Sequence, residues 1–156
     1  MWKFIIERSL QRLDGFLRQS IWKGRENEVV NLYVHHILVD EISHDGPLTA
    51  LSQVAIEVAV PQVTGSSKKY VRKDLVIWPQ PLMTAWPEGS LPAVIMEWKR
   101  DMRAACDPDI AWLSVFTSQY PQTLGVAVCA FLSGTRGVQW RFVKEGVPVA
   151  INNLRT

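Results

Sequence analysis

Two short stretches decide the fold: KDLVIW at residues 73–78 and AVIMEWK at residues 93–99. Each is an apolar run with charged residues at one end, a pattern that predicts a strand buried along most of its length. Residues two apart on a strand point to the same face, so we expect Glu97 and Lys99 to project together. If the two strands are neighbours, Asp74 and Glu97 converge.

Charged side chains at the end of a buried run cost free energy unless another group compensates them. Two carboxylates about 4 Å apart repel by roughly 4 kcal/mol at an effective dielectric near 20, and a divalent cation removes this penalty. Oxygen-only ligands suit Mg²⁺, which also accepts phosphate oxygens. An ion held by Asp74 and Glu97 can deliver a hydroxide and stabilise the charge that builds on a phosphate, while Lys99 steadies the attacking water or the developing negative charge. The alternative interpretation is an ordinary acid and a salt bridge at strand ends.

The surrounding sequence predicts one α/β domain whose central sheet is mixed and flanked by helices. Apolar residues at helical spacing predict an amphipathic helix over 4–17 and a second helix over 25–38, although the β-branched content of the latter leaves a strand open. The tripeptide Asp-Pro-Asp at residues 107–109 predicts the start of a third helix. Further strands are expected at 54–60, 70–78, 93–99, 124–132 and 138–144.

Composition sets the class of protein. With 156 residues, 47% apolar and 21% charged, the sequence is typical of a soluble globular chain. No apolar run approaches the roughly 18 residues of a membrane span, and the start of the chain lacks the long apolar stretch of a signal peptide. We therefore expect a cytoplasmic protein with no membrane partner.

Basic residues gather beside the acids, although a net charge of +2 does not by itself predict nucleic-acid binding. One cluster precedes Asp74 and another follows Glu97. These residues are candidates for binding the phosphates of a nucleic acid, and the alternative is that they are solvated lysines and arginines at loops and strand edges. The candidates are Lys68, Lys69, Arg72, Lys73, Arg100 and Arg103.

Asp74, followed by Glu97-Trp98-Lys99 at the end of a hydrophobic strand, resembles the PD-(D/E)xK, or restriction-endonuclease-like, nuclease superfamily. The residue before Asp74 is Lys73, where the family pattern has a proline that is often absent. Residues 26–30, Glu-Asn-Glu-Val-Val, are similar to the start of a helix in archaeal-type Holliday junction resolvases. The resemblance covers roughly residues 23–144.

The resemblance implies an αβββαβ core over 23–144, with an extra N-terminal helix over 1–20. It implies Mg²⁺ or Mn²⁺ held by Asp74, Glu97 and the main-chain carbonyl of Trp98, with Glu26 as a third acid and Lys99 as the catalytic lysine. Glu28 competes with Glu26 for that role, and both acids also suit the first turn of a helix. The implied activity is that of a DNA endonuclease, acting on branched or foreign DNA.

Two other functions remain open. A non-catalytic nuclease-like module would bind nucleic acid or protein through the basic residues 68–73. An interaction protein would form a homodimer through the helix of residues 1–17. Several further residues are weaker candidates: His35, His36 and His44 as ligands or bases, Glu57 as a neighbouring acid, and Trp78 and Trp86 as base-stacking residues.

Overall fold

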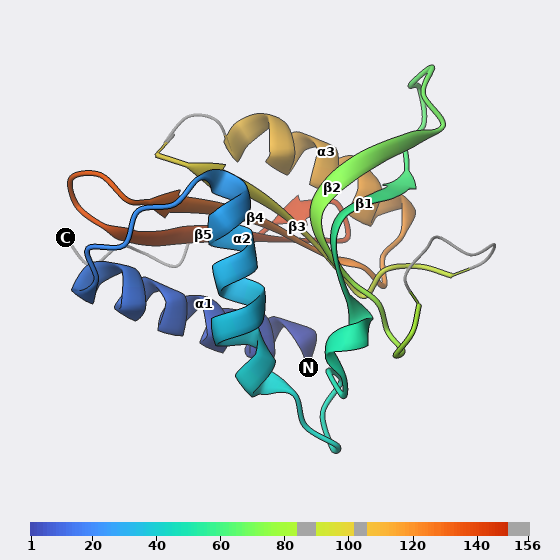
Figure 1. The fold of residues 1–156 in the computed structure, drawn as a ribbon. Coiled ribbons are helices and arrows are strands. Elements are labelled where there is room, and N and C mark those ends of the chain that lie inside the picture. The colour runs from blue at the N-terminus through green and yellow to red at the C-terminus, as the bar shows by residue number, and fades with distance from the viewer. Residues whose placement is uncertain (84–89, 102–105, 150–156) are drawn as a thin grey trace.

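A six-stranded mixed sheet, in the order β1-β2-β3-β4-β5-β6, forms the centre of the molecule (Figure 1). The computed structural model describes residues 1–83, 90–101 and 106–149. Strands β1 (Val54–Pro61), β2 (Tyr70–Ile77) and β3 (Val94–Arg100) form an antiparallel meander. Strand β4 (Leu124–Phe131) runs parallel to β3, and β5 (Gly137–Lys144) and the short β6 (Val147–Pro148) follow antiparallel. The predicted mixed sheet is confirmed, and β6 is an addition that the sequence did not predict.

Helices cover both faces of this sheet (Figure 1). Helix α1 (Trp2–Gln19) and helix α2 (Glu26–Leu32) lie on one face, and α3 (Cys106–Gln119) lies on the other as the crossover between the parallel strands β3 and β4. The chain remains helical after α2 through a π-helical turn at Tyr33–Ile37 and a 3-10 turn at Leu38–Glu41, and a second 3-10 turn spans Leu51–Gln53. The helical interpretation of residues 25–38 is therefore confirmed.

The core has two layers, one on each side of the sheet. The inner face of α1, built by Ile6, Leu10, Leu13 and Leu17, packs with α2 against the sheet, and all four side chains are fully buried. Each such side chain contributes about 1.5–3 kcal/mol relative to an exposed one. The apolar stripe of α1 is thus used within the chain, while the oligomeric state of the protein stays a prediction.

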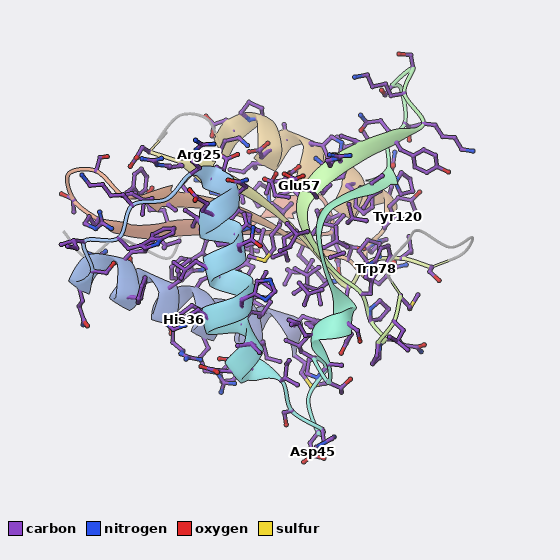
Figure 2. All side chains as sticks on the ribbon, in the orientation of Figure 1. Arg25, His36, Asp45, Glu57, Trp78 and Tyr120 are labelled. Atoms are coloured by element: carbon purple, nitrogen blue, oxygen red, sulfur yellow. The ribbon has the colours of Figure 1, made fainter. Side chains whose placement is uncertain are left out.

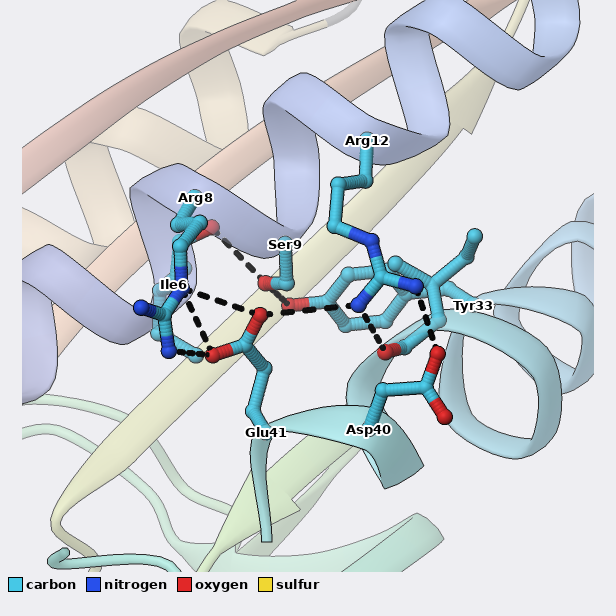
Figure 3. Close-up of polar contacts among 8 residues, drawn as sticks. Ile6, Arg8, Ser9, Arg12, Tyr33, Asp40 and Glu41 are labelled. Atoms are coloured by element: carbon cyan, nitrogen blue, oxygen red, sulfur yellow. Dashed lines mark hydrogen bonds and ion pairs between the residues drawn. The ribbon is translucent and has the colours of Figure 1, made fainter.

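A polar network joins α1 to the helical segment 26–41 (Figure 3). The Glu41 carboxylate, only 3% exposed, accepts hydrogen bonds from the Arg8 guanidinium on both oxygens, and Arg12 lies 3.6 Å from Oε1. The buried Tyr33 hydroxyl lies 2.7 Å from Ser9 Oγ. Because Glu41 is buried with its charge paired, this network fixes the position of α1 over the sheet.

Within the described ranges, no helix combines the length and the apolar character needed to cross a membrane.

Candidate active site

In the strand pair β1–β2, the side chains switch from one face of the sheet to the other, and the candidate site lies at this switch. Glu57 in the middle of β1 has a φ of 52°, in the left-handed region that non-glycine residues rarely adopt. Before this residue, Ile56 packs with the α1 side of the sheet, and after it Val58 packs with the α3 side, although strict alternation would keep both on one face. Figure 2 labels Glu57 on β1 beside β2. The same reversal occurs in β2 across Asp74, which would pair with Glu57 but is absent from the ladder.

Strands β2 and β3 separate at Asp74. Their ladder comprises Ile77 with Val94, Val76 with Ile95 and Leu75 with Met96, and it ends there. Beyond this point, the Asp74 carboxylate accepts a hydrogen bond of 2.7 Å from the backbone N–H of Trp98. The Asp74 side chain thus replaces the backbone acceptor that the Trp98 N–H lacks at the gap. This structural role alone explains why an acid occupies the position.

Glu97 lies next to Asp74 and is almost fully buried, with 6% of its surface exposed. Its Oε2 atom lies 3.5 Å from the backbone nitrogen of Asp74. Burial raises the pKa of Glu97 to about 7; the charge and hydrogen bond of Lys73 act in the opposite direction, and the nearby Asp74 carboxylate adds to the rise. The two acids that the sequence singled out therefore converge, as expected for adjacent strands.

Lys99 projects to the α3 side of the sheet, on the same face as Glu97. Its Nζ atom lies 3.3 Å from the Asp109 carboxylate on α3 and donates to the carbonyl of Trp98 at 2.9 Å. Partial burial alone would lower the pKa of Lys99, but the negative charges of Asp109, Glu26 and Asp74 outweigh it and raise that pKa. Lys99 is therefore a protonated ammonium surrounded by acids.

Glu26 and Glu28 occupy different surroundings. Glu26, at the start of α2, accepts a hydrogen bond of 3.2 Å from the backbone N–H of Arg100 at the end of β3. Glu28 is exposed and accepts a hydrogen bond from the backbone N–H of Arg25, so it caps the start of its own helix. Of the two competing acids, Glu26 is the one that the structure brings to Lys99.

Lys73 differs from its expected role as an exposed phosphate-binding residue. Its side chain is 6% exposed, and its ammonium contacts the Glu97 carboxylate and lies 3.5 Å from the centre of the Trp112 ring on α3. Strict alternation would point Lys73 away from Glu97, and the reversal at Glu57 and Asp74 turns it to the same side. Its position therefore contradicts the prediction that Lys73 is free to hold phosphate.

The other basic candidates divide into three groups. Lys68 and Lys69 are exposed on the loop between β1 and β2, and the exposed Arg72 lies 3.7 Å from the carboxylate of Glu57 on the neighbouring strand. Arg100 is half-buried and pairs with Asp101. Arg103 lies outside the described residues. Among these candidates, the exposed basic residues therefore lie on the β1–β2 hairpin, which extends from the body of the sheet (Figure 1).

The donor atoms fit a hard cation, although they are not arranged as a finished metal centre. Across residues 1–83, 90–101 and 106–149, no three His, Cys, Asp or Glu side chains gather closely enough to hold an ion. The two adjacent carboxylates of Asp74 and Glu97 nevertheless supply oxygen ligands, and Glu97 pairs with the ammonium of Lys73. The ionisable side chains of the site comprise four acids and two lysines: Glu26, Asp74, Glu97, Asp109, Lys73 and Lys99.

Sequence reasoning missed two residues of this site, Asp109 and Trp112. The sequence indicates Asp109 only as part of a helix start, and nothing local predicts that α3 brings it to Lys99. Among the weaker candidates, His36 lies on the helical segment after α2 (Figure 2). Trp78 is fully buried beneath α3 and is not accessible to a base, and Trp86 lies outside the described residues.

Comparisons of the chain with protein-family models, with curated proteins and with solved structures found no match.

Proposed function

We propose that this protein is a metal-dependent nuclease that hydrolyses phosphodiester bonds in DNA. The observation that carries the proposal is the gap between β2 and β3, where the carboxylates of Asp74 and Glu97 converge beside the ammonium of Lys99. Paired acids at a strand gap form an oxygen-ligand site for Mg²⁺ or Mn²⁺. A nuclease needs DNA within reach, and we propose the cytoplasm as its location.

The side chains divide the chemical work. Asp74, Glu97 and the carbonyl of Trp98 would hold the cation, which supplies a Lewis acid and a more acidic water when bound. Lys99 is protonated at neutral pH because Asp109, Glu26 and Asp74 raise its pKa. Lys99 therefore acts by stabilising negative charge on the phosphate, and it is a poor general base.

The exposed hairpin supplies the contacts that bring DNA to the site. Lys68, Lys69 and Arg72 present positive charge on β1–β2, the strand pair that carries Asp74. Contacts between such residues and phosphates release counterions, so binding weakens as the salt concentration rises. The hairpin and the acids together fit a substrate held by its backbone.

The decisive experiment compares the wild type with Lys99→Ala on supercoiled, single-stranded, forked and four-way DNA, with and without Mn²⁺. Lys3→Ala is the matched control, because Lys3 is an exposed lysine on α1. We expect Mn²⁺-dependent cutting by the wild type and by Lys3→Ala, with a loss of about 100-fold or more in Lys99→Ala. No cutting of any DNA by the wild type would contradict the proposal.

A second candidate function is a non-catalytic module that binds nucleic acid through the hairpin. The contact between Lys73 and Glu97 favours it, because an internal ammonium already neutralises one of the two acids. This function predicts salt-sensitive DNA binding that is unchanged in Lys99→Ala and reduced in a Lys68→Ala/Lys69→Ala double variant, with no cleavage by any of these proteins.

A further inference from the structure

We propose that Lys73 is an internal counter-ion that competes with a divalent cation for Glu97 and so sets the affinity of the site for metal. This inference rests on the proposed function, since it concerns the same two carboxylates. It assigns a role to the residue at which the chain departs from the nuclease pattern.

The position of Lys73 is built by the fold. The left-handed backbone at Glu57 and the break in pairing at Asp74 turn Lys73 to the α3 side, where Val71 and Val58 also pack. Its ammonium meets Glu97, and both side chains are more than nine-tenths buried. A mobile surface lysine that happened to approach an acid would be neither buried nor held by a strand reversal.

A second element holds the same ammonium. The Trp112 ring lies 3.5 Å from Lys73 Nζ, a distance at which the face of an indole attracts a cation. The indole N–H of Trp112 donates a hydrogen bond of 2.6 Å to Oε1 of Gln62, the residue that follows the end of β1 at the loop end of the hairpin. The ring is therefore fixed from α3 and from the hairpin, and the ammonium has a defined site beside Glu97.

This arrangement places the ammonium on the same carboxylate that a metal ion would use. Lys73 contacts Oε1 of Glu97, and Oε2 of the same carboxylate lies beside Asp74. A divalent ion shared by Asp74 and Glu97 would therefore lie close to the ammonium, and the two positive charges would repel each other. Removing the lysine charge, while leaving both acids in place, should strengthen metal binding at a pH where Glu97 is ionised without its partner.

The test uses the full chain and Mn²⁺ alone, without DNA. Binding is measured from the electron paramagnetic resonance signal of free Mn²⁺, and the melting temperature is measured with and without the ion. We expect Lys73→Met to bind Mn²⁺ at least tenfold more tightly than the wild type. Lys3→Met should match the wild type, and Glu97→Gln added to Lys73→Met should remove the gain. Equal affinity of the wild type and Lys73→Met would overturn the inference.

A folding defect does not prevent the test. Lys73→Met leaves a buried carboxylate without its partner, so this variant should melt at a lower temperature than the wild type, and Mn²⁺ should raise that temperature more than it does for the wild type. Lys73→Gln keeps a hydrogen-bond donor for Glu97 without the charge and should show the same gain in affinity. Variants that remain unfolded or unstabilised in Mn²⁺ would contradict the inference.

Failure of the inference about Lys73 is distinguishable from failure of the proposed function. Tighter Mn²⁺ binding by Lys73→Met without any DNA cleavage would support the inference and reject the nuclease. Cleavage by the wild type, together with unchanged Mn²⁺ affinity in Lys73→Met, would support the nuclease and reject the role of Lys73.

Discussion

Asp74 has a structural and a chemical role that two substitutions separate. Its carboxylate accepts the backbone N–H of the buried Trp98 at 2.7 Å and carries charge next to Glu97. Asp74→Asn removes the charge and keeps an oxygen that accepts the N–H. Asp74→Ala removes both, so the two variants differ chiefly in the fate of one buried hydrogen-bond donor.

The stability difference follows from that donor. Leaving a buried N–H without a partner costs about 1–3 kcal/mol, and both variants equally relieve the repulsion from Glu97. We therefore expect the free energy of unfolding of Asp74→Ala to be about 2 kcal/mol lower than that of Asp74→Asn. For a chain of this size, this corresponds to a melting temperature about 4–8 °C lower. Urea titration followed by tryptophan fluorescence and thermal melts without metal measure the two quantities.

DNA cleavage should behave differently from stability. Both variants lack the negative charge that would hold the cation, so we expect both to nick supercoiled DNA about 100-fold more slowly than the wild type. Equal melting temperatures would refute the role of Asp74 as the partner of Trp98. Wild-type cleavage by Asp74→Asn would refute its role in holding metal.

Three further predictions concern the scaffold. Glu41→Ala should lower the free energy of unfolding by about 2 kcal/mol in urea titrations, because it removes the hydrogen bonds from the Arg8 guanidinium to a buried carboxylate. Gly137→Ala should lower the melting temperature, because φ is 148° there and a Cβ atom would lie 2.4 Å from Asp14 Oδ1. Burial alone would raise the pKa of Asp101, but hydrogen bonds from the backbone N–H groups of Leu132 and Ser133 and from side chains lower it below 3.8. The stability that Asp101 contributes is therefore complete above pH 3.8 and is lost as the pH falls through the lower pKa, so Asp101→Asn should show a smaller acid-induced drop in melting temperature.

Each of these three predictions has a control variant or profile that can contradict it. Asp45→Ala, at an exposed turn, should change stability by no more than about 0.5 kcal/mol, and a Glu41→Ala effect of that size would contradict the proposed network. Gly134→Ala also meets a positive φ, but its Cβ meets no neighbouring atom, so it should be milder than Gly137→Ala. Parallel acid profiles of the wild type and Asp101→Asn would rule out the Asp101 contribution.

The order of helices and strands could be predicted because apolar periodicity is local. The alternation of Val54, Ile56, Val58 and Val60 predicted a strand, and the spacing of Ile6, Leu10, Leu13 and Leu17 predicted a helix, and both segments form as expected. Alternation failed in one respect, because it assigns all four valine and isoleucine positions of β1 to one face. The positive φ of Glu57 divides these four residues between the two faces, and a glutamate gives no sign of such a conformation in the sequence.

Of the site, the sequence by itself determined that Glu97 and Lys99 share a strand face and that Asp74 ends an apolar strand, since these follow from the two-residue period of an extended chain. Only the tertiary structure decided that Lys73 meets Glu97 and that Asp109 meets Lys99. Those contacts depend on a backbone reversal and on the docking of α3 across the sheet. Both are set by the packing of segments far apart in the chain, which no local pattern encodes.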